Sequence, residues 1–411
     1  MWEECAVDRG EKQFRSGTHR TVCPEDTLAR CRPLLPIMGI TRLANVTGLD
    51  ILGIPVVMAC RPNSRSVAVS QGKGLDLPAA KASAIMEAIE GFHGESVQSP
   101  LKLAAFEDLR YTHPIIDVDG LSASTNSRYD SRLPILWIEG SELVTGAPLW
   151  LPYEVVHTNY TIPAPTGSGC FVANSNGLAS GNHILEAICH GICEVVERDA
   201  TTLWKLQSDS VRSQAGLDLD TVDDDACRIV IQKFSDAGVD VLVWETTTDV
   251  SIASFQCLAL GGADSVADPE FGAGCHPNPG IALLRALTEA AQARTTYITG
   301  ARDDIGAGHY QASARTRRLK DCRALMADHQ PIRNFLKIPS WEGESFADDL
   351  NEIVRRLQSV GLHQIAVVDL TKPAFGIPVV RVVIPGLEGA MEGPEYVPGA
   401  RCHSSSFGDH S

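Results

Sequence analysis

The chain has 411 residues, of which 44% are hydrophobic and 21% are charged, a composition typical of a globular protein. Its formal net charge of −16 argues against proteins that bind nucleic acid or anionic membranes through clustered lysine and arginine. No apolar segment reaches the roughly 18 residues of a membrane helix, and the polar, acidic N-terminus does not resemble a secretory signal. We therefore expect a cytoplasmic protein without a nucleic-acid or membrane partner.

The hydrophobic pattern predicts an α+β fold of mainly antiparallel sheets packed with helices. Residues 1–40 are polar and irregular and are predicted to be an N-terminal extension, whereas residues 41–411 are predicted to form one domain. Strands are predicted at 51–60, 66–70, 135–139, 149–151, 239–245, 252–260, 364–369 and 377–384. Helices are predicted at 77–94, 182–205, 221–237, 280–299 and 345–360.

Two parts of the sequence indicate an internal pseudo-repeat. The predicted helices 221–237 and 345–360 are each followed by a glycine, a strand, a turn and a second strand. In addition, Gly53-Ile54-Pro55-Val56-Val57 and Gly376-Ile377-Pro378-Val379-Val380 are identical. A chance match between β-rich pentapeptides is the alternative. Because short turns join neighbouring strands, antiparallel pairing is favoured over a doubly wound parallel sheet.

The common signatures of phosphate and zinc sites are missing from the sequence. Segments rich in small residues precede two predicted helices, at 71–74 and 166–181, but neither matches G-x-x-x-x-G-K-[ST] or G-x-G-x-x-G. The 12 cysteines contain no Cys-x-x-Cys pair, so we expect reduced thiols and not a zinc site. A nucleotide site in this chain would therefore have to bind the phosphates without a glycine-rich loop of either kind.

Three predicted helices carry the same polar stripe with the spacing i, i+4, i+7, which places the three side chains on one helix face. The stripes are Ser83, Glu87 and Glu90; His190, Glu194 and Glu197; and Arg285, Glu289 and Gln292. Asn182 and Glu186 extend the second stripe toward its N-terminus. Each helix also has an apolar face, formed by Ile85, Ile89 and Phe92; Ile188, Ile192 and Val195; and Leu283, Leu287 and Ala290.

The stripes can be explained as solvated acidic faces or as a buried metal site. Solvated helix faces usually carry lysine or arginine at i+4 from each glutamate, and these stripes mostly lack it. Buried carboxylates have to be paired, hydrogen-bonded or bound to metal. Mg²⁺ takes oxygen ligands and shares them with phosphates, and Arg198, Arg285 and Arg294 are placed to clamp phosphate oxygens. The pattern therefore predicts a magnesium–nucleotide site.

The stripes and their surroundings resemble the nucleotide-binding motifs of the YcaO superfamily. The segments 72–90, 175–200 and 285–294 resemble its three motifs in the same chain order, and the resemblance extends over roughly residues 12 to 402. The triplet Arg302-Asp303-Asp304 resembles the branch that accompanies TfuA-like partner proteins. The family's fold is the α+β arrangement already predicted.

The resemblance implies functions for individual residues. Five glutamates would bind Mg²⁺ and the triphosphate: Glu87, Glu90, Glu186, Glu194 and Glu197. Six further residues would complete the ATP site: Ser83, Asn182, Arg198, Arg285, Glu289 and Gln292. In the N-terminal extension, Lys12, Arg15 or Arg20 would reach the phosphates, so that residues 1–40 contribute to the nucleotide site of a catalytic domain at 41–411. His190 is a candidate acid or base, although a structural histidine is the simpler interpretation.

The resemblance implies an ATP- and Mg²⁺-dependent enzyme that phosphorylates a backbone amide oxygen of a peptide or protein before a nucleophile attacks. Azole-forming members use a neighbouring Cys, Ser or Thr, whereas thioamide-forming members use external sulfide. The sequence lacks the PxPxP tail of azole-forming members, which favours thioamide formation with a TfuA-like partner in natural-product or protein modification. An azoline-forming cyclodehydratase and a non-catalytic nucleotide- or peptide-binding scaffold are the alternatives. The family also implies a homodimer.

Overall fold

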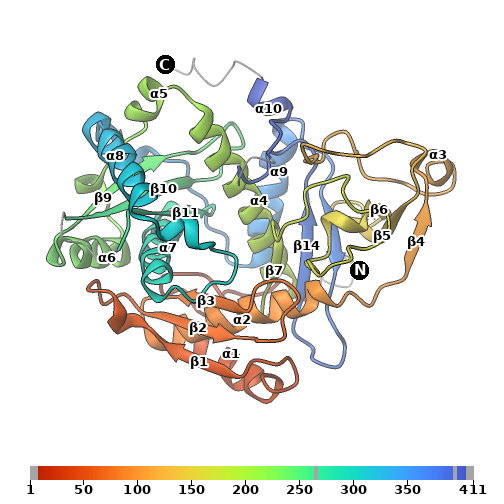
Figure 1. Ribbon diagram of the computed structural model, residues 1–411, viewed down its shortest axis with the longest axis horizontal. Coiled ribbons are helices and arrows are strands. Elements are labelled where there is room, and N and C mark those ends of the chain that lie inside the picture. The colour runs from red at the N-terminus through yellow and green to blue at the C-terminus, as the bar shows by residue number, and fades with distance from the viewer. Residues whose placement is uncertain (1–7, 263–266, 392–395, 404–411) are drawn as a thin grey trace. The chain divides into compact units, whose positions relative to one another are not determined.

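The computed structural model describes residues 8–262, 267–391 and 396–403 (Figure 1). The chain divides into two units, each assembled from separate segments. The first unit takes Met1–Gln13, Ile89–Leu203 and Gly343–Ser411, and the second takes Phe14–Ala88 and Trp204–Glu342. The predicted N-terminal extension therefore contributes segments to both units. None of the described helices is long and apolar enough to cross a membrane.

The first unit is built on a six-stranded sheet. Its strands are β4 (Leu101–Ala104), β5 (Ile135–Glu142), β6 (Pro148–Pro152), β7 (Leu178–Ser180), β13 (Ala366–Asp369) and β14 (Val379–Val383). The order is β4-β5-β13-β14-β7 with β6 paired to β5, and every pairing is antiparallel. The unit also contains α3 (Phe106–Leu109), α9 (Phe346–Ser359), α10 (Ala400–His403) and most of α4 (Ile184–Leu206).

The second unit contains two three-stranded antiparallel sheets, β1-β2-β3 and β11-β10-β9. Their strands are β1 (Arg42–Asn45), β2 (Val56–Cys60), β3 (Val69–Lys73), β9 (Val239–Glu245), β10 (Ser254–Gly261) and β11 (Glu270–Cys275). The short strands β8 (Leu217–Asp218) and β12 (Arg333–Asn334) form a parallel pair. The helices are α1 (Pro24–Cys31), α5 (Asp209–Gln214), α6 (Asp225–Asp236), α7 (Pro279–Thr299), α8 (Ala312–Asp328) and most of α2 (Leu77–Glu95). Antiparallel pairing thus dominates both units, as predicted.

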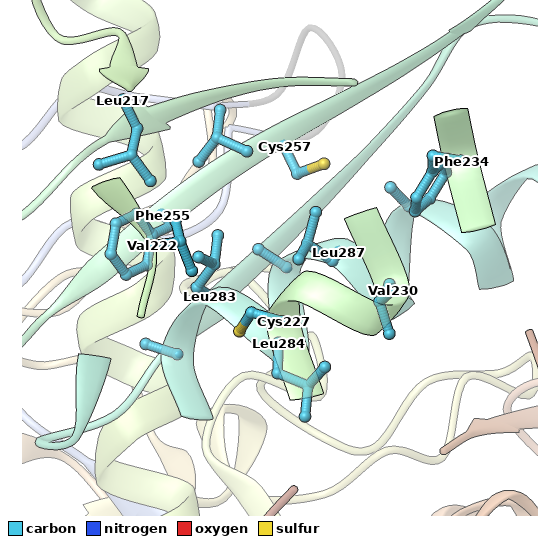
Figure 2. Packing of buried hydrophobic residues seen from close by; sticks show 14 of the residues in the cluster. Leu217, Val222, Cys227, Val230, Phe234, Phe255, Cys257, Leu283, Leu284 and Leu287 are labelled. Carbon is cyan, nitrogen blue, oxygen red and sulfur yellow. The ribbon is translucent and has the colours of Figure 1, made fainter. Parts of the chain in front are cut away.

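Helix α7 packs against the β9–β11 sheet together with α6, and Figure 2 shows their apolar side chains turned toward one another and toward β10. Val230 of α6, Leu287 of α7 and Phe255 of β10 are all buried in this cluster. The predicted apolar stripes of α2, α4 and α7 are buried at eight of their nine positions, with Phe92 half-buried. Burial of this face anchors each helix and fixes which way its polar stripe points.

The predicted pseudo-repeat is confirmed in the fold. Helix α6 precedes the antiparallel pair β9 and β10, and α9 precedes the antiparallel pair β13 and β14. The two identical pentapeptides also occupy equivalent places. The first leads into β2, which lies between β1 and β3, and the second leads into β14, which lies between β13 and β7. Gly53 and Gly376 both have a left-handed backbone, with φ of 62° and 64°. A chance match does not account for this agreement.

Several local predictions were wrong. Residues 1–40 are not irregular throughout, because α1 begins at Pro24, a residue that the first helical turn tolerates. Helix α8 was not predicted because its sequence is mostly polar and charged, and Cys322 is its only buried residue. Strand β2 begins at Val56 and not at residue 51, since the left-handed Gly53 and Pro55 interrupt extended pairing before it. No disulfide links the cysteines of the described residues, as expected.

Candidate magnesium and nucleotide site

The three helices with polar stripes follow their strands in the same way. The junctions run from Lys73 to Leu77, from Ser180 to Ile184, and from Cys275 to Pro279. The three connections have equal length, and each stripe starts equally far from the beginning of its helix. The structure therefore contains three copies of one strand–turn–helix element, and each copy presents its polar stripe at the same position.

Glycines in the preceding strands let two of these helices lie directly on the sheet. A Cβ atom on Gly72 of β3 would lie 2.0 Å from the Ala84 nitrogen of α2. A Cβ atom on Gly274 of β11 would lie 2.0 Å from the Ala282 carbonyl oxygen of α7. Because both distances are far below van der Waals contact, a side chain at either glycine would push the helix and its stripe away from the sheet.

The small residues at 166–181 serve close packing around α4. Gly177 has a φ of 78°, and a Cβ atom there would lie 2.3 Å from the Val382 carbonyl oxygen of β14. On α4, a Cβ atom on Gly191 would lie 2.8 Å from a methyl carbon of Val382. The glycines thus let α4 approach β14, which brings the stripe of α4 near the side chains of that strand.

Four of the predicted magnesium ligands belong to the first unit. Glu90, near the C-terminal end of α2, accepts hydrogen bonds from the backbone nitrogen of Ser180 at 2.8 Å and from its hydroxyl at 2.7 Å. On α4, Glu186 and Glu197 are buried, with exposed fractions of 2% and 7%, and Glu194 is half-buried. The prediction of burial is therefore confirmed for Glu186 and Glu197, whereas Glu194 is only partly shielded from solvent. A fully solvated acidic face does not describe this helix.

Arg381 is a cation of the first unit that the sequence analysis did not identify. It lies on β14 opposite Leu178 of β7 and is 2% exposed. Its Nη2 donates a hydrogen bond to Oδ1 of Asn174 at 3.2 Å. Burial lowers the pKa of Arg381 to about 10, while the charges of Tyr160 and Glu194 act to raise it. Arg381 is therefore within electrostatic reach of a predicted magnesium ligand.

The second unit holds the stripe of α7. The Glu289 carboxylate forms an ion pair with Lys73 at 2.6 Å and accepts a hydrogen bond from the Ala273 nitrogen at 3.3 Å. Gln292 donates to the backbone oxygen of Gln71 at 2.8 Å. Lys73 ends the strand that leads into α2, at the place that Ser180 occupies in β7. The sequence analysis quoted Lys73 within a motif but gave it no function.

One expectation for this helix is corrected. Arg294 does not project as a phosphate clamp, because its side chain is 1% exposed and donates from Nε at 3.0 Å and Nη2 at 3.1 Å to both oxygens of Asp50. Asp50 neutralises the Arg294 charge within the second unit. Since Arg294 is two positions beyond Gln292, it projects from a different side of α7 than the stripe does.

The remaining predicted residues have varied surroundings. Ser83, Arg285, Asn182, His190 and Arg198 are half-buried, and Glu87 is exposed. In the N-terminal segment, the buried Lys12 forms an ion pair with Asp349 at 2.6 Å and donates to the Gly343 oxygen at 2.8 Å. Arg15 pairs with Glu342, and Arg20 donates to the His19 oxygen at 3.4 Å. The assignment of all these residues to a nucleotide site stays a prediction.

The donor set fits a hard metal ion. Glu90, Glu186, Glu194 and Glu197 offer only carboxylate oxygens, the ligands that Mg²⁺ prefers. Two of these carboxylates are buried, where a metal ion would offset the cost of holding negative charge away from water. The side chains and their burial are thus compatible with magnesium and an attached phosphate.

Comparison with known proteins agrees with these features. A family model described as YcaO cyclodehydratase, ATP- and Mg²⁺-binding, matches residues 71–388. An uncharacterized protein in the tfuA 3′ region of Rhizobium leguminosarum bv. trifolii is 36% identical over 400 residues, which cover 95% of this chain and 94% of that protein. An uncharacterized protein of Methanothermobacter thermautotrophicus is 36% identical over 399 residues, covering 94% and 99%.

Solved structures share the fold. A heterocyclase in complex with substrate and cofactor has a TM-score of 0.77 at 24% identity, covering 93% of this chain and 54% of the heterocyclase. The chain thus spans about half the length of that protein. YcaO from Methanopyrus kandleri, bound with AMPPCP and Mg²⁺, has a TM-score of 0.72 at 22% identity, covering 92% and 95%. These similarities show a common fold.

Proposed function

Because the chain belongs to the YcaO family, whose members are described as binding ATP and Mg²⁺, we propose that it is an enzyme that activates a backbone amide of a peptide or protein. ATP would supply the phosphoryl group. The observation that carries this proposal is that two carboxylates of the α4 stripe, Glu186 and Glu197, are buried, because carboxylate oxygens are the ligands that Mg²⁺ prefers and a bound cation stabilises them away from water.

In this proposal Glu90, Glu186, Glu194 and Glu197 hold the magnesium-bound nucleotide, with Asn182 and Arg198 beside them. Glu87, Ser83, Arg285, Glu289 and Gln292 are assigned to nucleotide binding on the family motifs alone. Magnesium, when bound, would neutralise charge on the phosphates. The enzyme's own contribution is to position the amide oxygen in line with the terminal phosphate, because phosphoryl transfer depends chiefly on orientation and charge stabilisation.

The proposed reaction has two steps. The amide oxygen attacks the terminal phosphorus, and the bond from that phosphorus to the rest of the nucleotide breaks. A nucleophile then adds to the amide carbon, and the carbon–oxygen bond breaks as phosphate departs. Neither step requires a covalent link to the protein. His190 of α4 is half-buried on the stripe and is a candidate to move the proton that the nucleophile releases.

We favour thioamide formation over azoline formation as the outcome. One support is the relative described as lying in a tfuA 3′ region, which is 36% identical over almost the whole chain. A TfuA-like partner would then assist delivery of sulfide, and the enzyme would act as a homodimer. The product mass separates the outcomes: cyclodehydration removes one water from the peptide, whereas thioamidation exchanges oxygen for the heavier sulfur. A peptide that loses water in the presence of ATP, sulfide and the partner would favour azoline formation.

The first experiment tests nucleotide binding by isothermal titration with AMPPCP, with and without Mg²⁺. Wild-type protein is expected to bind only in the presence of Mg²⁺, and the Glu194→Ala/Glu197→Ala double variant is expected not to bind. The matched control is Glu107→Ala/Asp108→Ala on α3, which removes the same charge from exposed positions of the same unit. Binding that persists in the α4 variant would contradict the site assignment and favour a scaffold with structural carboxylates.

A further inference from the structure

Arg381 holds more hydrogen-bond donors than its surroundings use. Among the described residues, its Nε and Nη1 have no hydrogen-bond partner, and its guanidinium forms no ion pair. Its contact with Asn174 is to a neutral amide oxygen. A buried arginine normally has a carboxylate or several hydrogen-bond acceptors in direct contact with it. The charge of Glu194 acts on Arg381 without forming an ion pair with it, so two buried donors of Arg381 have no acceptor among the described residues.

A second donor lies in the same region. His157 is 3% exposed, and its Nδ1 accepts a hydrogen bond from the Asn159 nitrogen at 3.1 Å. Burial and the nearby charge of Arg381 lower the pKa of His157 to about 4, so the ring is neutral near pH 7. Since Nδ1 acts as an acceptor, the ring proton is on Nε2, which also has no partner among the residues described. The unsatisfied groups of both Arg381 and His157 are therefore donors.

The charges near Arg381 also indicate which kind of ligand would fit there. Glu194 and Tyr160 raise the pKa of Arg381, whereas His157 is a neutral ring. Glu194 is half-buried and is a proposed magnesium ligand, so a metal at Glu194 would itself withdraw negative charge from the surroundings of Arg381. A neutral carbonyl would accept one hydrogen bond but would add no negative charge near the guanidinium. An anion with several oxygens would supply both the acceptors and the charge, and the planar guanidinium can bind two oxygens of a phosphate at once.

We propose that Arg381 binds a phosphoryl oxygen, either on the terminal phosphate of the nucleotide or on the phosphate after its transfer, and that Asn174 holds the guanidinium in position. This inference rests on the proposed function and adds a phosphate-binding residue on β14 that the family motifs of α2, α4 and α7 do not contain. His157 would supply a further donor from its Nε2.

The test compares ligands that differ in the terminal phosphate. Mg-AMPPCP and Mg-ADP are titrated separately, and inorganic phosphate is titrated into protein saturated with Mg-ADP. The variant Arg381→Gln removes the charge. The variant Asn174→Asp keeps Arg381 but sets a carboxylate against it, in competition with the phosphate. Arg355→Gln on α9 is the control, because Arg355 is 66% exposed and its loss removes the same charge.

We expect both variants to weaken Mg-AMPPCP binding, phosphate binding or both by about tenfold or more, the loss of a charge-assisted hydrogen bond. Mg-ADP affinity should stay within about twofold of wild type. A loss confined to AMPPCP places the contact on the nucleotide's own phosphate, and a loss confined to added phosphate places it after transfer. Unchanged affinities for both ligands in the two variants would overturn the proposal.

The Asn174→Asp variant also separates a phosphate site from a purely structural arginine. A structural Arg381 would gain an ion partner, so thermal stability would rise while ligand affinities stayed the same, an outcome that contradicts the proposal. If Arg381→Gln fails to fold, the ligand affinities of Asn174→Asp alone decide whether Arg381 binds phosphate. If wild-type protein binds no nucleotide, the proposed function fails separately, and titration of inorganic phosphate alone into wild type and Asn174→Asp then decides whether an anion binds at Arg381.

Discussion

The buried pair of Arg294 and Asp50 gives a prediction whose size follows from its geometry. Their side chains are 1% and 6% exposed, and two parallel hydrogen bonds of 3.0 and 3.1 Å join them. Removing one member leaves the other as a buried, uncompensated charge, which costs about 3–5 kcal/mol. We therefore expect Asp50→Ala to lower the free energy of unfolding by about that amount. Removing both members in Asp50→Ala/Arg294→Met should cost clearly less than the two single changes together.

The assay is equilibrium unfolding in urea of wild type, both single variants and the double variant, which together give the coupling energy. Two charge-assisted hydrogen bonds predict a coupling of roughly 2–4 kcal/mol. A cost below about 1 kcal/mol for Asp50→Ala, or additive single changes, would refute the structural account of this pair. The same proteins test the corrected assignment, because folded Arg294→Met should bind Mg-AMPPCP like wild type. Lost binding at unchanged stability would restore Arg294 as a phosphate clamp.

Three further predictions concern stability. Gly274→Ala should cost about 3 kcal/mol or more, because its Cβ would lie 2.0 Å from a carbonyl oxygen of α7, whereas Gly306→Ala, with nothing within 4 Å, should be nearly neutral in the same urea assay. Burial raises the pKa of Glu270 to about 8, above the value in the unfolded chain. The contribution of Glu270 to the free energy of unfolding is therefore complete below about pH 4.5 and is lost as the pH rises toward 8, at about 1.4 kcal/mol per pH unit. Glu270→Gln should remove this pH dependence, and an equal pH dependence in the variant would contradict the assignment. Arg401→Ala should lower the melting temperature because it leaves the buried Asp199 without its ion-pair partner. The decrease should be smaller at pH 5 than at pH 7, because burial raises the pKa of the Asp199 carboxyl to about 6 and the group is mostly neutral at pH 5. A decrease that does not depend on pH would argue against the charge as its cause.

The sequence predicted the glutamate-bearing elements well because their signals are local. A helix that buries one face repeats its apolar residues with the helical period, and α2, α4 and α7 all do so. Helix α8 consists mostly of polar and charged residues, so its composition did not separate it from a loop. Helix α1 was missed for another reason, since it is short and lies within the polar segment 1–40, and it begins at Pro24, a residue compatible with the first helical position.

The site was predicted less completely because some of its contacts join distant segments. Glu90 meets Ser180 only after α2 and β7 come together, and Lys73 meets Glu289 across a sequence separation of 216. Arg381 stands in a strand of valines, where a charged residue is unexpected in a buried position. That contrast was the available signal, because a lone arginine inside a predicted buried strand needs a partner.

The charges around α4 also explain how an acidic protein can bind an acidic ligand. With a formal net charge of −16 and four carboxylates at the proposed site of the first unit, nucleotide without metal would meet repulsion that Arg198 and Arg381 together cannot offset. Magnesium reverses the sign of this interaction, since it is attracted by the carboxylates and by the phosphates alike. Metal and nucleotide should then strengthen each other's binding by the same factor, as linkage requires. Arg381, within electrostatic reach of Glu194, would then add a positive charge of the protein's own near one of the proposed metal ligands.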